Sequence, residues 1–228
     1  MAFDIKTSKW LNESKSGNFV FAPVGGICNV QIFDKIRDET CGEMIGNLAQ
    51  IIAQLPMQKP IDTASIKIES PYEISQDRFV FDVVINSGGG DVMVARSIAS
   101  MFALAKSRGA IIRTHNIGRA ASAASWLAIQ GTPGYRIMSA DAHNLIHYGS
   151  VNVSGSRDQE LEIETQNTKK SRKLLFDTYE QYTKLTPKEL TKYARVENSG
   201  KLFAQECLEK YLCDWILTSD GRLIGHSR

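Results

Sequence analysis

A nearly continuous run of β-branched and aromatic residues, FVFDVVI at 79–85, constrains the fold most strongly. A strand of this composition is typical of a parallel sheet that is covered on both faces. The sequence NSGGGD ends the run abruptly, and VMVARSIASMFALAK follows with helical periodicity. Further strands are expected at 110–116, in YRIMS and in NLIHY, with an alanine-rich helix after the first of them. This alternation predicts an α/β fold of stacked, right-handed βα units.

The composition sets limits on what the chain binds and where it works. Its 228 residues suit one domain, and its net charge of +2 gives no electrostatic argument for nucleic acid or an acidic membrane. The polar start lacks the apolar core of a signal peptide, and no apolar run reaches the length of a membrane span. The four cysteines are scattered, without metal-ligand spacing. We therefore expect a soluble cytoplasmic protein with reduced thiols, no metal site and no cofactor.

Three loops leave the carboxyl ends of the expected strands, where parallel sheets collect their reactive groups. The first is NSGGGD, whose glycines permit unusual φ angles and leave amide N–H groups pointing into a crevice. It lacks the spacing of either common phosphate-binding motif. On its own, this loop is equally well explained as a tight turn.

The second loop, NIGRAASAAS, contains a candidate nucleophile. Ser122 is flanked two residues away on each side by Ala120 and Ala124. Hydrolase nucleophiles on sharp strand-to-helix turns need such small neighbours. The next amide, of Ala123, would then be placed to stabilise an oxyanion. The alternative reading is a helix whose small residues serve only close packing.

The third is NLIHYGS, in which a candidate base, His147, follows an apolar strand and precedes a glycine turn. A serine hydroxyl needs a base whose pKa is near neutrality, and histidine is the usual choice. Of the other three histidines, His226 lies in the tail and His115 within a strand, whereas His143 precedes the last strand and is a competitor. A purely structural histidine is the alternative.

Together, the order INSGGG, GRAASAAS and LIHYGS resembles the ClpP peptidases, whose motifs read INSPGG, GxAASMGA and MIHQP. The resemblance covers roughly residues 25–218 and implies a ClpP/crotonase-like fold, a spiral of βαβ units with a protruding handle helix at about 157–184. It divides the chain into a flexible segment at 1–24, a peptidase domain at 25–218 and a tail at 219–228.

The resemblance also implies a role for each matching residue. Ser122 resembles the nucleophile, His147 the general base, and the amides of Gly89 and Ala123 the oxyanion hole. Extended substrate would pair as an added strand with the backbone on both sides. The residues expected to bind it in this way are Gly88, Gly90, Tyr148 and Gly149.

The sequence departs from the family at the third member of the triad. The aspartate that orients the histidine falls on Ser199 or Gly200, depending on the direction of counting, and neither is a carboxylate. Glu197 is the only acid in this window and is our choice for the role. Asn198 or Ser199 in a weakened triad is the alternative. Gly88 for proline and HYG for HQP are the other departures.

Function and assembly follow from the same resemblance. It implies a serine endopeptidase that degrades unfolded polypeptides inside a chamber, a heptameric ring or two stacked rings, served by an AAA+ ATP-driven unfoldase. The polar helix at 157–184 would meet its counterpart across the rings, pairing acidic with basic side chains: Glu160, Glu162 and Glu164 with Lys169, Lys170, Arg172 and Lys173. Alternatives are a catalytically silent subunit of a mixed ring, a viral prohead-type protease and the acyl-CoA chemistry of crotonases.

Overall fold

The computed structural model describes residues 17–21, 23–65, 67–147, 158–195 and 200–226. Its centre is a mixed sheet in the order β1-β2-β3-β4-β5-β8-β9, with β6 beside β4 and β7 beside β6. The strands are β1 (Asn18–Val20), β2 (Ile27–Ile32), β3 (Val80–Ser87), β4 (Ile111–Ala121), β5 (Arg136–Ser139), β6 (His143–Leu145), β7 (Lys201–Phe203), β8 (Trp215–Leu217) and β9 (Leu223–Gly225). The helices are α1 (Asp38–Gln54), α2 (Val92–Ser107), α3 (Ala123–Ala128), α4 (Asp158–Tyr182), α5 (Pro187–Arg195) and α6 (Ala204–Glu209).

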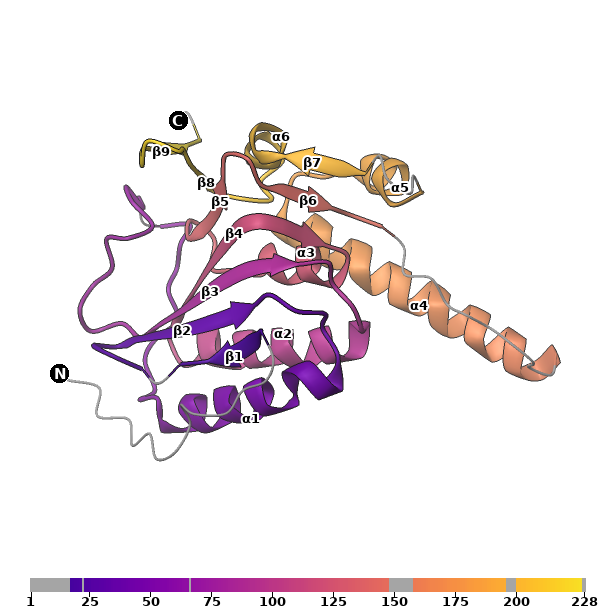
Figure 1. The fold of residues 1–228 in the computed structure, drawn as a ribbon, viewed down its shortest axis with the longest axis horizontal. Helices are drawn as coiled ribbons and strands as arrows, with labels where there is room; N and C mark the ends of the chain where they lie inside the picture. The colour runs from indigo at the N-terminus through magenta and orange to yellow at the C-terminus, as the bar shows by residue number, and fades with distance from the viewer. Residues whose placement is uncertain (1–16, 22, 66, 148–157, 196–199, 227–228) are drawn as a thin grey trace.

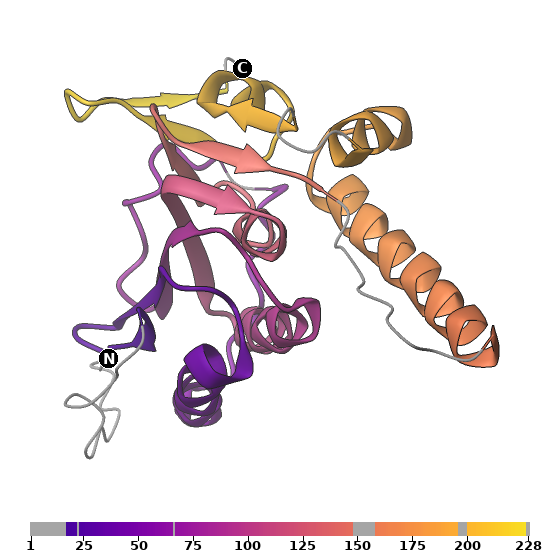
Figure 2. The same cartoon turned by 45° about the vertical axis from the view of Figure 1, so that its right-hand side comes forward.

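Strands β2, β3, β4, β5 and β8 are parallel, which confirms the parallel sheet expected from the sequence. Both faces of β3 are covered, as its composition predicts. Phe81, Val83 and Ile85 enter the main core under helices α1, α2 and α3, which lie on one side of the sheet in Figure 2. On the other side, Val80 packs in a second cluster with Ile68 and neighbouring residues of the 56–78 connection.

Strand β4 is longer than the sequence predicts. It continues through Gly118 to Ala121, where we expected the alanine-rich helix to have begun. Ala120 pairs on one side with Ser87 and on the other with Asn144 of β6. This pairing on both sides outweighs the helix propensity of the alanines, so the helix is confined to the six residues of α3.

The sheet also extends past both expected domain boundaries. Strand β1, at Asn18–Val20, pairs with β2, and β9, at Leu223–Gly225, pairs with β8. The described parts of the expected N-terminal segment and C-terminal tail therefore contribute strands to the same sheet.

The long polar helix is present as α4, and Figure 1 shows it extending away from the body of the molecule. Among its described side chains, those near the C-terminal end reach the core, where the Tyr179 hydroxyl hydrogen-bonds Ser125 Oγ of α3 at 2.8 Å. Leu175, Phe176 and Tyr182 pack partly buried against the same core. Its length and polarity match the expectation, while its role as a handle helix stays a prediction.

A buried ion pair fixes the end of the sheet next to α4. Arg136 and Asp214 are both more than nine-tenths buried and join through two charge-assisted hydrogen bonds, at 2.6 and 2.9 Å. Asp214 also accepts the backbone N–H groups of Gly134 and Arg136. Burial by itself disfavours the charged guanidinium, but the Asp214 carboxylate outweighs it and raises the pKa of Arg136.

Candidate active site

Ser122 occupies a strained corner between β4 and α3. Its backbone has φ 56° and ψ −126°, a region that serine rarely adopts and that costs about 1–3 kcal/mol. Its N–H donates to the Leu145 carbonyl of β6 at 2.8 Å, which anchors the corner to the neighbouring strand. Its side chain makes no capping hydrogen bond to α3. This is the strand-to-helix corner that the small flanking residues predict.

The glycine loop packs directly against this corner. A Cβ on Gly89, whose φ is +86°, would lie 2.4 Å from the Ala121 carbonyl oxygen and 2.8 Å from Ser122 Cβ. The same position is 2.9 Å from the Ala123 nitrogen, so the structure brings the two expected oxyanion residues together. Only glycine permits this approach.

Hydrogen bonds hold the glycine loop in place. The Gly89 N–H donates to Ser87 Oγ at 3.1 Å, and that hydroxyl donates to the Asp34 carbonyl at 2.7 Å. The Gly89 carbonyl accepts the N–H of Ile36 at 3.0 Å. The Gly89 amide is therefore engaged by Ser87, a residue to which our sequence analysis gave no role although it lies within the INSGGG motif.

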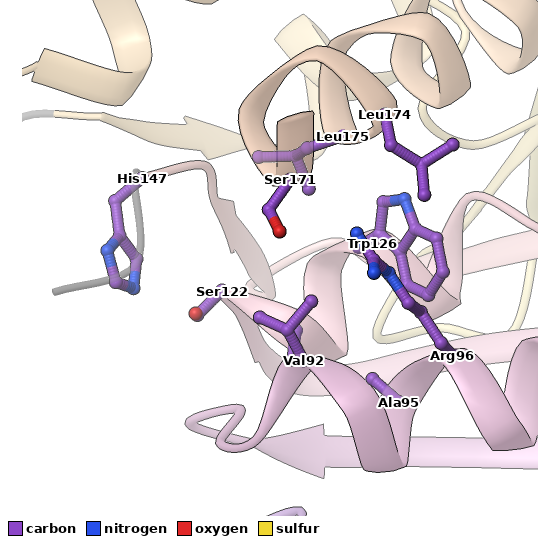
Figure 3. Close-up of a pocket in the computed structure, with 10 residues that line it drawn as sticks. Val92, Ala95, Arg96, Ser122, Trp126, His147, Ser171, Leu174 and Leu175 are labelled. Carbon is purple, nitrogen blue, oxygen red and sulfur yellow. The ribbon is translucent and has the colours of Figure 1, made fainter. Parts of the chain in front are cut away.

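Ser122 and His147 both line two hollows that meet at the corner. One is a cleft with a cavity volume of about 610 Å³, lined also by Gly88, Gly89 and Gly90. The other is a small cavity of about 40 Å³ between α2, α3 and α4. Figure 3 shows the Ser122 hydroxyl directed towards the side on which the His147 ring lies. The expected nucleophile, base and glycine loop thus share one site.

The other histidines are used elsewhere. His115 Nε2 lies 3.2 Å from Ser139 Oγ, and burial lowers its pKa. The competitor His143 begins β6 and packs against the Phe203 ring, and burial followed by the nearby cations lowers its pKa. His226 stacks on Tyr211. His147 is the one histidine of the four that lines the cleft.

Ser125, the other serine of the AASAAS motif, is fully buried and hydrogen-bonded to Tyr179. It holds α3 against α4 and does not face the cleft. The structure therefore distinguishes the two serines that the sequence places three residues apart.

Part of the expected site lies outside the described residues, namely Tyr148 and Gly149 together with Glu197, Asn198 and Ser199. Their roles stay predictions. The residue after this last window is well placed: Gly200 accepts the N–H of Ile146, the neighbour of His147, at 3.4 Å. A Cβ on Gly200 would lie 2.8 Å from the Ile146 carbonyl oxygen, so the chain passes close to the strand end that carries His147.

Three further side chains near the site were not expected from the sequence. The Arg119 guanidinium covers Gly88, where a Cβ would lie 3.2 Å from its Nη2, so glycine leaves room for the arginine. Arg96 and Trp126 line the small cavity. The sequence does not predict that either residue lies at the site, because the cavity forms only where α2 and α3 meet α4.

Within the described residues, no three His, Cys, Asp or Glu side chains are grouped closely enough to hold a metal ion. All four cysteines are buried and free, and burial raises the pKa of the Cys28 and Cys207 thiols to about 12. Of the helices that the structure describes, none combines the length and apolar character that crossing a bilayer requires.

The model of the Clp protease family matches residues 73–220 of this chain, about two thirds of its length. The chain belongs to the Clp protease family. This confirms the resemblance seen in the motifs, and the matched region contains Ser122, His147 and the 197–199 window. Strand β2 and helix α1 lie before it, although β2 belongs to the same sheet and α1 packs in the same core.

Clp protease relatives resemble the chain at moderate identity. It is 31% identical over 142 residues to ATP-dependent Clp protease proteolytic subunit 1 of Tropheryma whipplei, covering 62% of this chain and 66% of that protein. It is 30% identical over 136 residues to proteolytic subunit 2 of Leifsonia xyli, covering 59% of each. The chain thus spans between 59% and 66% of the length of these two relatives.

Proposed function

We propose that this chain is a serine endopeptidase subunit that cleaves unfolded polypeptides, with Ser122 as nucleophile and His147 as general base. The observation that carries the proposal is the strained Ser122 corner, which opens into a cleft shared with His147 and the glycine loop. Backbone strain of this kind at a cleft is typical of active sites. Membership of the Clp protease family supports the same conclusion.

In the proposed reaction, Ser122 Oγ bonds to the carbonyl carbon of the scissile peptide while its proton passes to His147. The N–H groups of Gly89 and Ala123 stabilise the oxyanion. Collapse of the intermediate breaks the C–N bond, and His147 gives the proton to the departing amine. Water, activated by the same histidine, then hydrolyses the acyl-enzyme. Because Gly89 N–H meets Ser87 Oγ at 3.1 Å, it must share or exchange that partner when substrate binds.

Glu197 is the proposed orienting group for His147. It is three residues before Gly200, a span of at most about 11 Å along an extended chain, and Gly200 hydrogen-bonds the neighbour of His147. The extended substrate is proposed to pair with Gly88 and Gly90 on one side and with Tyr148 and Gly149 on the other.

A serine-directed fluorophosphonate probe tests the nucleophile. It should label the native chain, and Ser122→Ala should abolish labelling while folding stays intact. Ser171→Ala is the matched control, because Ser171 also lines the small cavity but belongs to α4. Labelling that persists in Ser122→Ala would refute the assignment.

The assembly proposed for the chain is a heptameric ring, or two stacked rings, formed by a peptidase domain at about 25–218 together with strands β1 and β9, which extend its sheet. The handle role of α4 rests on its exposed charged middle, where Lys169, Lys170, Arg172 and Lys173 follow one another closely. An AAA+ unfoldase would deliver unfolded chains in the cytoplasm. The relatives are named as subunits of an ATP-dependent protease, which supports this partner.

Sedimentation and light scattering test the assembly. We expect rings at low salt and weaker stacking as salt rises, because screening weakens contacts between exposed charges. A monomer at micromolar concentration in low salt would refute the ring. A ring mass independent of salt would refute the charge-paired contact between rings.

A second candidate is a catalytically silent subunit of a mixed ring. The observation in its favour is the sequence ENSG at 197–200, which lacks the family's aspartate. The probe separates the two candidates, because a silent subunit would not be labelled at Ser122.

A further inference from the structure

The small cavity beside Ser122 has apolar walls and a polar interior end. Val92 and Ala95 of α2 form one wall, and Leu174 and Leu175 of α4 form the opposite one. Ser122 and His147 lie at its mouth (Figure 3). A carbonyl carbon bound to Ser122 Oγ would therefore place the side chain of its own residue at the entrance to this cavity.

Trp126 supplies a hydrogen-bond donor that nothing in the described structure uses. The residue is only 7% exposed, and its Nε1 is buried without a partner among the described residues. A buried N–H without an acceptor is costly, and an acceptor brought in by a ligand would remove that cost. Since Trp126 lines the cavity, a group bound in the cavity is the expected source of that acceptor.

Arg96 supplies a second donor and a positive charge. Its side chain extends from α2 into the space between Val92 and Trp126 (Figure 3). Its contact with Met93 is to a thioether sulfur at 3.6 Å, a weak acceptor. No Asp or Glu is among the described residues that line the cavity, so no carboxylate there neutralises this guanidinium.

Exposed cations are also frequent on the stretch of α4 that borders the cavity. Ser171 of α4 lines the cavity, and exposed cations stand directly beside it in the sequence at Lys170 and Arg172. The carboxylate of Asp177, about two turns further along, accepts two hydrogen bonds from Lys173. Of the cations near the cavity, Arg96 lines the cavity itself, and its charge favours an anion there.

We propose that this cavity selects the side chain next to the scissile bond and prefers one that ends in a carboxylate, glutamate first. The methylene groups of glutamate would lie between the apolar walls, and its oxygens would accept from Arg96 and Trp126. A cavity of about 40 Å³ has room for about three water-sized groups, which suits glutamate or leucine and excludes a large aromatic ring. This specificity rests on the proposed peptidase function of Ser122.

Paired peptides test the preference. Two internally quenched peptides that differ only in glutamate or leucine before the cleaved bond should differ on the order of tenfold in kcat/KM, with glutamate favoured, as expected for a charge-assisted hydrogen bond. Arg96→Gln should remove most of this ratio, and Trp126→Phe, which keeps the ring but loses Nε1, should reduce it by a smaller factor. Arg96→Glu should reverse it in favour of a lysine peptide.

Lys188→Gln is the matched control, because it removes one positive charge from an exposed position on α5 that lines neither hollow. Its glutamate-to-leucine ratio should equal that of the native chain. Equal cleavage of both peptides by the native chain would overturn the proposed specificity and leave the peptidase function standing.

A binding measurement separates this inference from the reaction itself. With the Ser122→Ala chain, fluorescence anisotropy should show a peptide ending in glutamate binding about tenfold more tightly than the same peptide ending in leucine. Arg96→Gln in the same background should abolish the difference. Preferential binding without turnover by the native chain would refute the peptidase, whereas equal binding of both peptides would refute the selective cavity.

Discussion

Strand β3 and helix α4 differ in how many of their side chains are buried. In β3, five hydrophobic or small polar side chains are buried within eight residues, and the strand has parallel neighbours on both sides. In α4, Thr178 and Tyr179 are the buried ones among the side chains described. The first element is held by its own chain along its whole length, and the second only near its C-terminal end.

The difference indicates which surfaces are complete within one chain. The sheet carries the Ser122 corner and needs nothing further to fix it, because β6 and the glycine loop already pack on it. The exposed charged part of α4 is not stabilised by burial in this chain's core. A long polar helix of this kind either stays solvated or packs on another polar surface. Variants in the two regions should therefore differ in both the size and the kind of their effects.

The largest expected effect concerns Glu197, the residue proposed to orient His147. Glu197→Gln should lower kcat for peptide hydrolysis by a factor on the order of 10²–10⁴, because an unoriented histidine is a poor base. Asn198→Ala and Ser199→Ala are matched controls from the same window and should retain most activity. Unchanged hydrolysis by Glu197→Gln would instead favour Asn198, Ser199 or a two-residue mechanism.

The next largest effect concerns the stability of the sheet. Asp214→Asn should lower the free energy of unfolding by about 3–5 kcal/mol, since it leaves the buried Arg136 guanidinium without a counter-charge. Denaturant unfolding monitored by circular dichroism measures this. A loss well below 1 kcal/mol would mean that the pair is not desolvated as the structure indicates.

These core features were largely readable from the sequence, because burial dictates them. FVFDVVI predicts a strand covered on both faces, and alternation predicts its parallel neighbours; both are confirmed. The prediction of a helix was wrong at Gly118–Ala121. The alanines favour a helix there, but pairing with β3 and β6 makes the segment a strand. Local propensity is a weak guide wherever such contacts between distant segments decide the outcome.

The candidate site was readable only in part. A Cβ on Gly89 would lie 2.8 Å from Ser122 Cβ, so the close approach of the two segments requires a glycine, and this requirement appears in the local sequence. Arg96, Trp126 and the Arg119 side chain over Gly88 carry no such signal. Their proximity depends on how helices and strands cross, which residue spacing does not encode.

A smaller effect is expected where the two regions join. Tyr179→Phe leaves the fully buried Ser125 hydroxyl without its partner and should cost about 1–3 kcal/mol in unfolding free energy. Burial raises the pKa of Tyr179 well above its ordinary value, so the phenol stays protonated across the usual pH range. The double variant with Ser125→Ala should recover part of the loss, because no polar group is then left unpaired. Full additivity of the two losses would show that the hydroxyls do not interact.

The smallest effect is expected on α4 itself. Asp177→Asn removes the ion pair with Lys173, but both side chains are more than half exposed, so water and salt already screen their attraction. The denaturant midpoint should stay within experimental error of the native value, in contrast to the buried aspartate of the sheet. Both substitutions exchange an aspartate for asparagine beside one cation, but Asp214 is buried and also accepts two backbone N–H groups, whereas Asp177 is exposed. If Asp177→Asn destabilised the chain as much as Asp214→Asn, then α4 would be supported by its own chain. The contrast between a sheet that is stabilised within its own chain and a helix whose charged part is not would then be wrong.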